Sequence, residues 1–334
     1  MDRVVNTRRP THHRLGKVVV TGKIPRPGLD LLVGADHDVV AWEHETTIPR
    51  DELLRRVAGA DVIVSLLTEK IDAELLDAAG SQLRAVCNVA VGHNNIDLPA
   101  CRERGVIATN TPGVLTDATA DLAMALILMT TRRLAEGERL IRSGEPWQWG
   151  MFMMLGTGLQ GARLGLVGMG QIGTALARRA KSFGMTIGYT NRNPVDAALA
   201  AELDAVHLPL DELLATSDVV SLHCPYSPET HHLIGAAELT SMRNTAYLVN
   251  TARGPVVNEA ALVAALEKGE LAGAGLDVFE KEPEVHHGLL ERDDVVLIPH
   301  LGSATVETRT AMATLAARNA LAVLAGQDPV TPIS

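Results

Sequence analysis

Residues 166–173 read Leu-Val-Gly-Met-Gly-Gln-Ile-Gly, an apolar strand that runs into a G-x-G-x-x-G turn. Each glycine meets a separate backbone requirement: Gly168 permits the tight turn, Gly170 the close approach of a phosphate group, and Gly173 the packing of a helix on the strand. The flanking sequence is strand-like before the turn and helix-forming after it. The motif therefore predicts a strand–turn–helix unit whose helix N-terminus binds the pyrophosphate of a dinucleotide; the alternative is a plain βα turn.

The bulk composition narrows the class of protein. A chain of 334 residues is long enough for about two domains. A hydrophobic content of 46% with only 3% aromatic residues is typical of a soluble α/β protein. The net charge of −10 argues against nucleic acid or an anionic membrane as a partner.

The cysteines, the longest apolar run and the N-terminal segment indicate in which compartment the protein is found. Three unpatterned cysteines (Cys87, Cys101 and Cys224) favour neither a disulfide framework nor a zinc site, and no metal site is expected. The longest apolar run, residues 122–129, is too short to span a bilayer. Residues 1–16 contain arginines but no apolar core of a signal peptide, so we expect a disordered tail and a cytoplasmic protein.

Strand-like and helix-like segments alternate along the chain, which predicts βαβ units and parallel sheets. We expect helices at 50–57 and 72–79. The first series of expected strands is 17–21, 39–42, 61–66 and 83–87, and the second is 163–167, 185–189, 219–223, 247–250, 273–277 and 295–298.

The two series resemble each other, because residues 51–66 (DELLRRVAGADVIVSL) are echoed by residues 211–223 (DELLATSDVVSLH). We interpret them as two doubly wound parallel-sheet domains, a Rossmann domain and a flavodoxin-like domain. Ligands of such sheets bind beyond the carboxyl ends of the strands. Gly92 and Arg253 are then expected on opposite walls of a cleft between the domains; alternatively, the similarity is only what any two βαβ units share.

The domain boundaries follow from the helices between and after the two series. One helix is expected over 117–144, about 40 Å long at 1.5 Å per residue. The last helix, 305–325, could return to the first domain. We therefore expect a discontinuous substrate domain made of 17–110 and 301–334, and a dinucleotide-binding domain over 111–300.

Three polar residues follow late strands of the second series: Arg253, Glu282 and His300. Singly, each has an ordinary explanation, as a surface cation, part of a solvated acidic run and a loop cap. Together they suit reduction of a 2-keto acid, in which a guanidinium binds the carboxylate and an imidazolium protonates the carbonyl oxygen. Glu282 would orient His300 and keep it charged. Asp277, at a strand end, could hold the nicotinamide carboxamide or neighbouring loops.

Other histidines are weaker candidates. His93 lies in a glycine-containing loop whose N–H groups could bind a carboxylate, but no acidic partner for it is evident. We expect solvent or loop positions for His223, His231, His232, His286 and His287.

With these motifs in place, the chain resembles the D-isomer-specific 2-hydroxyacid dehydrogenases from Lys17 to Gln327. The resemblance rests on motifs in the family's order: VAVGHNNID (89–97), NTPGVLTDATAD (110–121), GLVGMGQIG (165–173), LHCPYSPETHHLI (222–234), VNTARGPVVNE (249–259), GLDVFEKEP (275–283) and PHLGSAT (299–305).

The resemblance implies that Arg253, Glu282 and His300 are the catalytic residues, with Arg253 also binding the substrate. It implies substrate carboxylate binding by the amides of Val91 and Gly92, and a homodimer formed through the cofactor domains. The cofactor-binding residues that it implies are Gly168, Gly170, Gln171, Ile172, Gly173, Asn191, Arg192, Pro225, Thr230, Thr251, Ala252, Arg253, Asp277, His300 and Gly302.

Departures from related enzymes narrow the substrate. Glu282 stands where formate dehydrogenases have a glutamine, which disfavours formate as the substrate. Val91 stands where phosphite dehydrogenases have a lysine, which argues against phosphite. The chain ends soon after the last expected helix, so we expect no regulatory domain of the kind found in many phosphoglycerate dehydrogenases. The sequence is most similar to the glyoxylate/hydroxypyruvate reductases, which implies reduction of one of these acids to the D-2-hydroxy acid.

The second Rossmann strand bears on the choice of cofactor. Residues 189–193 (Tyr-Thr-Asn-Arg-Asn) lack the carboxylate that grips the ribose 2′-hydroxyl of NAD, and Arg192 is placed to meet a 2′-phosphate. We therefore expect a preference for NADPH, with NADH possible.

Alternatives remain at this point. A dehydrogenase of another 2-keto acid or of 3-phosphoglycerate has the same motifs, and the same fold also serves in dinucleotide-sensing corepressors. Trp147 and Trp149 follow the long helix; they either pack onto a partner or close over a substrate pocket, in this subunit or the neighbouring one.

Overall fold

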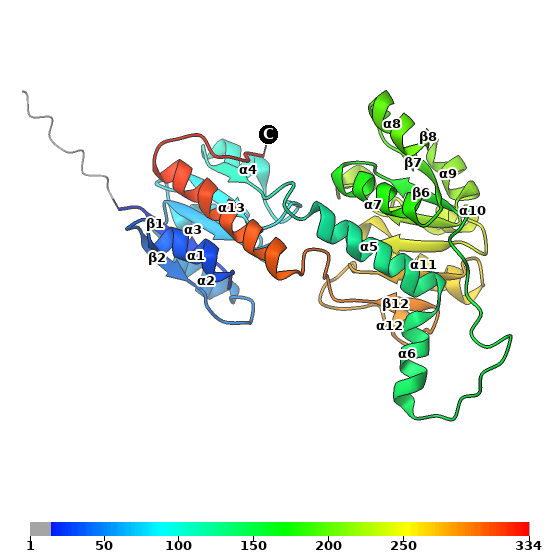
Figure 1. The fold of residues 1–334 in the computed structure, drawn as a ribbon. Coiled ribbons are helices and arrows are strands. Elements are labelled where there is room, and N and C mark those ends of the chain that lie inside the picture. Colours follow the sequence, from blue (N-terminus) through cyan, green and yellow to red (C-terminus); the bar gives the residue numbers. More distant parts are fainter. Residues whose placement is uncertain (1–14, 334) are drawn as a thin grey trace, which may run out of the picture. The chain divides into compact units, whose positions relative to one another are not determined.

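The computed structural model describes residues 15–333, so the tail predicted at the N-terminus lies almost wholly outside the described residues. The chain forms two compact units. The first runs to Pro112 and resumes at Thr310, and the second is Gly113–Arg309. Each unit is an α/β domain built on one parallel sheet (Figure 1). The fold class expected from the alternating pattern is confirmed.

The first unit contains a five-stranded sheet in the order β2-β1-β3-β4-β5. Every neighbouring pair is parallel, and the order is that of flavodoxin-like folds. Val, Ile and Ala side chains dominate the central strands because both faces of the sheet are buried. The strands are β1 (Lys17–Val20), β2 (Asp38–Ala41), β3 (Val62–Ser65), β4 (Ala85–Asn88) and β5 (Ile107–Thr109).

The helices of this unit are α1 (Arg26–Val33), α2 (Arg50–Val57), α3 (Ala73–Ala79), α4 (Leu98–Glu103) and, from Thr310 onward, α13 (Val306–Leu324). α1 and α13 approach at backbone distance, because a Cβ on Gly28 would lie 2.7 Å from the carbonyl carbon of Ala313. The C-terminal helix is thereby held against the N-terminal one.

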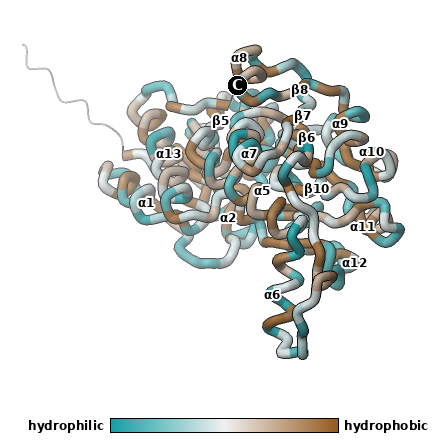
Figure 2. The backbone as a smooth tube through the Cα atoms, turned by 45° about the vertical axis from the view of Figure 1, so that its right-hand side comes forward, coloured by the Kyte–Doolittle hydropathy of each residue, from teal (hydrophilic) through white to brown (hydrophobic). Residues whose placement is uncertain are grey.

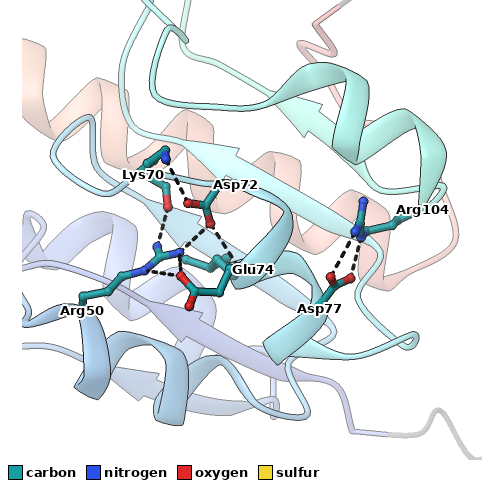
Figure 3. A network of polar contacts seen from close by, with 7 residues as sticks. Arg50, Lys70, Asp72, Glu74, Asp77 and Arg104 are labelled. Carbon is teal, nitrogen blue, oxygen red and sulfur yellow. Dashed lines mark hydrogen bonds and ion pairs between the residues drawn. The ribbon is translucent and has the colours of Figure 1, made fainter.

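Ion pairs join the helices α2, α3 and α4 on the surface of this unit (Figure 3). Arg50, at the start of α2, contacts Asp72 at 2.5 Å and Glu74 at 2.7 Å. Arg104, which ends α4, pairs with Asp77 of α3 at 2.7 Å. Because these side chains are partly exposed, water screens the charges and each pair contributes little to the stability of the fold.

The second unit contains a seven-stranded sheet in the order β12-β11-β10-β9-β6-β7-β8, parallel throughout. From β6 the chain adds β7 and β8 on one side of the sheet. It then crosses back, so that β9 pairs with the other side of β6. This is the switch point beside which Rossmann folds bind dinucleotides. The strands are β6 (Arg163–Val167), β7 (Thr186–Thr190), β8 (Ala205–His207), β9 (Val219–Leu222), β10 (Tyr247–Asn250), β11 (Gly273–Leu276) and β12 (Val295–Leu297).

Alternate residues of these strands enter two separate cores, as the two-residue period of a strand requires. Val219 and Val249 belong to one core, and Val220 and Leu248 to the other. The helices and 3₁₀ turns that cover the sheet are α5 (Thr116–Thr131), α7 (Gln171–Ser182), α8 (Ala197–Leu203), α9 (Leu210–Thr216), η1 (Pro228–Thr230), α10 (Ala236–Ser241), η2 (Gly254–Val256), α11 (Glu259–Glu267) and α12 (His287–Leu290).

The single helix expected over 117–144 is wrong. The chain forms α5 and then α6 (Leu134–Ser143), because Arg133 between them has a left-handed φ of 54°. The last two residues of α5, Thr130 and Thr131, bond back to carbonyls one turn earlier. α5 is buried on the sheet, whereas α6 buries no residue and projects from this unit (Figure 1).

The joins between the units also differ from the expected ones after residues 110 and 300. Residues 111–112 belong with the first unit, where the Thr111 amide donates to the carbonyl of Ala90. Residues 301–309 belong with the second, because the Asp277 carboxylate accepts the amide of Gly302 at 2.9 Å. Two strands, β5 and β8, were not expected; at three residues each, they are too short to show a hydrophobic period.

Candidate active site

The glycine-rich turn has the stereochemistry that its sequence predicts. Gly168 has φ 97°, and a Cβ there would lie 2.7 Å from the amide nitrogen of Cys224. A Cβ on Gly173 would lie 2.3 Å from the carbonyl oxygen of Gly168. A Cβ on Gly170, in contrast, would meet nothing within 4 Å among the described residues. The first and third glycines are therefore required by the fold, and the second leaves open space in front of the turn.

This open space lies at the start of α7. Gly170 is the N-cap residue and provides no side-chain acceptor for the first turn, which begins with Gln171 and Ile172. Unsatisfied N–H groups and the positive end of the helix dipole both favour an anion at this point. The turn thus fits the pyrophosphate of a dinucleotide.

The end of β7 supports the same loop. The side-chain oxygen of Asn191 accepts the amide of Met169 at 2.7 Å, so this residue holds the glycine-rich turn. Arg192 is exposed beside it. Its charge contributes to a lowered pKa of Glu229, although the hydrogen bond from Ser227 is the larger cause.

Five other predicted cofactor residues lie in the loops that follow β9 and β10: Pro225, Thr230, Thr251, Ala252 and Arg253. Thr230 donates its hydroxyl to the carbonyl of Pro225 at 2.9 Å, which closes the loop after β9. Asn250 accepts the amide of Ala252 at 3.0 Å. The buried hydroxyl of Thr251 has no hydrogen-bond partner within the described part of the chain.

Asp277 organises the loop that carries His300. Its carboxylate accepts the amides of Leu301 at 2.5 Å and Gly302 at 2.9 Å, and its carbonyl accepts the amide of His300 at 2.8 Å. Burial raises the pKa of Asp277, and these hydrogen bonds oppose the rise. Of the roles considered for Asp277, the structure shows the loop-holding one.

Glu282 and His300 meet in this unit. The Nδ1 atom of His300 lies 2.8 Å from Oε2 of Glu282, and Oε1 of the same carboxylate accepts the amide of Phe279 at 3.0 Å. The His300 side chain is 28% exposed and the Glu282 side chain 31% exposed. Because Nδ1 is engaged, Nε2 is the ring atom left to face a ligand.

The charges of the site are coupled. Burial, the largest single cause, raises the pKa of Glu282. The hydrogen bond and charge of His300, the hydrogen bond from the Phe279 amide and the charge of Arg253 together lower this pKa below its ordinary value. Burial lowers the pKa of the Arg253 guanidinium, and the charge of Glu282 opposes this. Since an arginine stays protonated in proteins, the site holds a carboxylate beside a fixed cation.

A tight backbone contact ties Arg253 to the loop of Glu282. The next residue, Gly254, packs so closely that a Cβ on it would lie 1.9 Å from the carbonyl carbon and oxygen of Phe279. No side chain larger than hydrogen fits there without moving the 279–282 loop.

Residues that were not predicted as site residues also hold the 279–282 loop, through Glu280. The Glu280 carboxylate pairs with the imidazole of His232, and the Glu280 amide donates to the buried carboxylate of Glu259 at 2.7 Å. Burial, the largest cause, raises the pKa of Glu259. His232 lies in a loop, as expected, but its pairing with Glu280 was not predicted, because the two residues are 48 positions apart and no local pattern signals the pair.

His223 also lies in a loop, as expected, directly after β9. Its Nε2 lies 2.8 Å from the hydroxyl of Ser221, its ring is mostly enclosed, and burial lowers its pKa to about 4. The position directly after a buried strand was the available signal.

The predicted substrate-binding residues Val91 and Gly92 lie in the first unit, in the loop after β4. His93 follows them, and its buried Nδ1 has no hydrogen-bond partner among residues 15–333. Trp147 and Trp149 are 54% and 73% exposed in the segment after α6.

Residues 15–333 contain no group of three or more histidine, cysteine or acidic residues arranged to hold a metal ion. None of their helices combines the length and the apolar character needed to cross a membrane.

A Rossmann sheet with this turn and a carboxylate–histidine pair defines a nicotinamide-dependent oxidoreductase. The sequence profile of the D-isomer specific 2-hydroxyacid dehydrogenase NAD binding domain matches residues 124–302. The chain belongs to this family, and it is an enzyme of the NAD(P)-dependent 2-hydroxyacid dehydrogenase type.

Similar proteins cover nearly the whole chain. A glyoxylate reductase of Thermococcus onnurineus is 48% identical over 94% of this chain and 95% of its own. A solved structure from Thermus thermophilus has a TM-score of 0.89 and 44% identity over 95% of this chain and 100% of its own. An NADPH-dependent glyoxylate/hydroxypyruvate reductase from Sinorhizobium meliloti, solved with NADP and malonate, has a TM-score of 0.81 and 33% identity over 96% and 97%.

Proposed function

We propose that this protein reduces a small 2-keto acid, glyoxylate or hydroxypyruvate, to the D-2-hydroxy acid with NADPH. The observation that carries the proposal is the hydrogen bond of 2.8 Å between His300 and Glu282, in the unit that also carries the dinucleotide-binding turn. The glyoxylate reductase names of the relatives support the choice of acid.

His300 is the proton donor in this proposal. The nicotinamide dinucleotide, when bound, supplies a hydride to the carbonyl carbon. His300 donates a proton from Nε2 to the carbonyl oxygen as negative charge develops there. Glu282 accepts the hydrogen bond from Nδ1 and thereby sets the tautomer, the ring orientation and the preference for the charged imidazole.

Arg253 supplies the fixed positive charge. A guanidinium binds a carboxylate with two parallel hydrogen bonds and cannot lose its proton at neutral pH. We assign Arg253 to the carboxylate and carbonyl of the substrate, together with the amides of Val91 and Gly92. The overall charge of −10 makes this local cation necessary for an anionic substrate.

The cofactor preference follows from β7. The segment after this strand has an exposed Arg192 and an Asn191 whose side-chain oxygen is already used by Met169. An arginine favours the 2′-phosphate of NADPH, and a carboxylate that would favour NADH is absent from residues 189–193. NADH remains a possible second cofactor.

We also propose a homodimer formed through the dinucleotide-binding unit. α6 and the segment to Leu155 form a projecting arm with hydrophobic residues along its length (Figure 2). Phe152 is 88% exposed and Leu155 is 61% exposed. An arm of this composition is stabilised when a second copy covers it. A cytoplasmic location is supported by the three cysteines, all unbridged.

A substrate panel tests the function. Glyoxylate, hydroxypyruvate, pyruvate, longer 2-keto acids and 3-phosphohydroxypyruvate are each assayed with NADPH and with NADH. We expect the highest kcat/KM for glyoxylate or hydroxypyruvate with NADPH. A clear preference for NADH contradicts the cofactor assignment, and activity only on the phosphorylated acid contradicts the substrate assignment.

A further inference from the structure

Three consecutive peptide carbonyls of the loop after β4 are held by donors at the edge of the five-stranded sheet. The Ala90 carbonyl accepts the amide of Thr111 at 2.9 Å. The Val91 carbonyl accepts the side-chain amide of Asn110 at 2.8 Å. The Gly92 carbonyl accepts the side-chain amide of Asn88 at 3.1 Å.

These bonds determine where the N–H groups of the loop point. In a planar trans peptide the N–H of one residue is directed opposite to the carbonyl of the residue before it. The N–H groups of Val91, Gly92 and His93 therefore point away from the donors at the sheet edge. Within the described residues, none of these three N–H groups donates to a protein acceptor.

The two asparagines are themselves fixed. The side-chain oxygen of Asn88 accepts the hydroxyl of Ser65 at 3.0 Å, and both residues are fully buried. Asn95 lies within 3.2 Å of the Asn88 amide and donates to the carbonyls of Leu66 and Glu69. With its oxygen committed to Ser65, Asn88 can turn only its NH₂ group toward Gly92.

Asn110 is anchored through its backbone. Its carbonyl accepts the hydroxyl of Thr331 at 2.6 Å, and Thr331 is in turn bonded by the side chain of the buried Asn319. The segment near the C-terminus thus holds the strand end from which Asn110 reaches the loop. Neither asparagine is free to release the loop carbonyl that it binds.

We propose that Asn88 and Asn110 are positioning residues that turn the N–H groups of Val91, Gly92 and His93 toward the carboxylate of the substrate. Successive N–H groups on one side of a loop form an anion-binding concavity. The proposal rests on the proposed function, and it adds the His93 amide to the expected carboxylate contacts.

The test removes one donor at a time. Asn110→Ala and Asn88→Ala are compared with wild type for KM and kcat toward glyoxylate, and for inhibition by oxamate, a carboxylate that is not reduced. We expect KM and the oxamate inhibition constant to rise about tenfold in each variant, since one orienting hydrogen bond is lost. We expect kcat and the dissociation constant of NADPH to change little.

Gln82→Ala is the matched control. The Gln82 side-chain amide donates to the carbonyls of Ala79 and Ala60, and it lies before β4 rather than after it. This control removes the same type of hydrogen bond from the same unit and should lower the melting temperature without changing KM. Unchanged KM in both asparagine variants would overturn the proposal, even with a lowered melting temperature.

Direct binding separates this inference from the proposed function. Oxamate binding to the complex with NADPH is measured by calorimetry for wild type and Asn110→Ala. If wild type reduces no 2-keto acid, the proposed function fails. The inference still stands if wild type binds oxamate and the variant binds it about tenfold more weakly, and it fails if the two bind oxamate equally or if neither binds it.

Discussion

His300 and Glu282 are joined by a hydrogen bond of 2.8 Å between Nδ1 and Oε2, while Oε1 of Glu282 is occupied by the amide of Phe279. The carboxylate is thus held at both oxygens, and it presents one fixed acceptor to the imidazole. Because the ring is oriented through Nδ1, the proposed chemistry falls to Nε2.

His300→Ala tests the proton donor. We expect kcat/KM toward glyoxylate to fall about 1,000-fold, since general acid catalysis is lost. NADPH affinity, measured by cofactor fluorescence, should change little. His287→Ala is the control because His287 is an exposed histidine of the same unit, with a side chain 83% exposed. A kcat/KM within tenfold of wild type for His300→Ala would contradict the assignment.

Arg192→Ala tests the cofactor preference. Loss of the cation next to the 2′-phosphate should raise KM for NADPH at least tenfold and leave KM for NADH nearly unchanged. Arg178→Ala is a matched control, because Arg178 is an exposed arginine of α7 that pairs with Glu202. If the substitution changed KM equally for NADPH and NADH, Arg192 would not be the residue that binds the 2′-phosphate.

Gly254→Ala tests the contact between the Arg253 segment and the loop of Glu282. A methyl group there would overlap the carbonyl of Phe279, so the 279–282 loop must shift. We expect a loss of about 1–3 kcal/mol in the free energy of unfolding and a kcat lowered at least tenfold. Gly158→Ala should alter neither, since its Cβ would meet nothing within 4 Å among the described residues. Wild-type kcat in Gly254→Ala would contradict the prediction.

His223 is expected to make the fold sensitive to acid. Burial lowers its pKa from 6.5 to about 4, so the unfolded chain binds a proton before the folded one does. The free energy of unfolding should therefore fall as the pH drops from about 6.5 to about 4, by up to about 3 kcal/mol from this residue. Its contribution is fully present above pH 6.5.

Urea unfolding of wild type and His223→Gln at pH 7 and pH 4.5 measures this contribution. The variant should lose less stability than wild type between the two pH values, although it is the less stable protein at pH 7. His287→Gln should follow wild type, because its side chain is 83% exposed. Identical pH dependence in His223→Gln and wild type would show that His223 is not the group responsible.

The double substitution Phe152→Ser and Leu155→Ser tests the proposed dimer. Two exposed apolar side chains of the arm are lost, so we expect sedimentation velocity to show dissociation at concentrations where wild type is dimeric. Val206→Ser, which removes an apolar side chain 51% exposed on β8, should leave the assembly intact. A wild-type protein that sediments as a monomer would contradict the proposal.

Much of the molecule could be predicted from local sequence. Strand β10 and helix α2 have the expected bounds, 247–250 and 50–57. The glycines at 168 and 173 have the steric roles that their spacing indicates. These features depend on residues within a few positions of one another, where backbone geometry and hydrophobic period act directly.

The sequence by itself determined the two α/β units, the dinucleotide-binding turn and the choice of Arg253, Glu282 and His300. Only the tertiary structure decided that α5 ends at Thr131, that His232 is paired with Glu280, and that Asn88 and Asn110 direct the loop carbonyls. The end of α5 rests on a left-handed residue, and the pairings of His232 and Asn110 join residues 48 and 19 positions apart. Asn88 and Gly92 are only four positions apart, but their bond requires the loop conformation that the sheet imposes. Their pairing depends on how the sheets bring strand ends together, which no local period encodes.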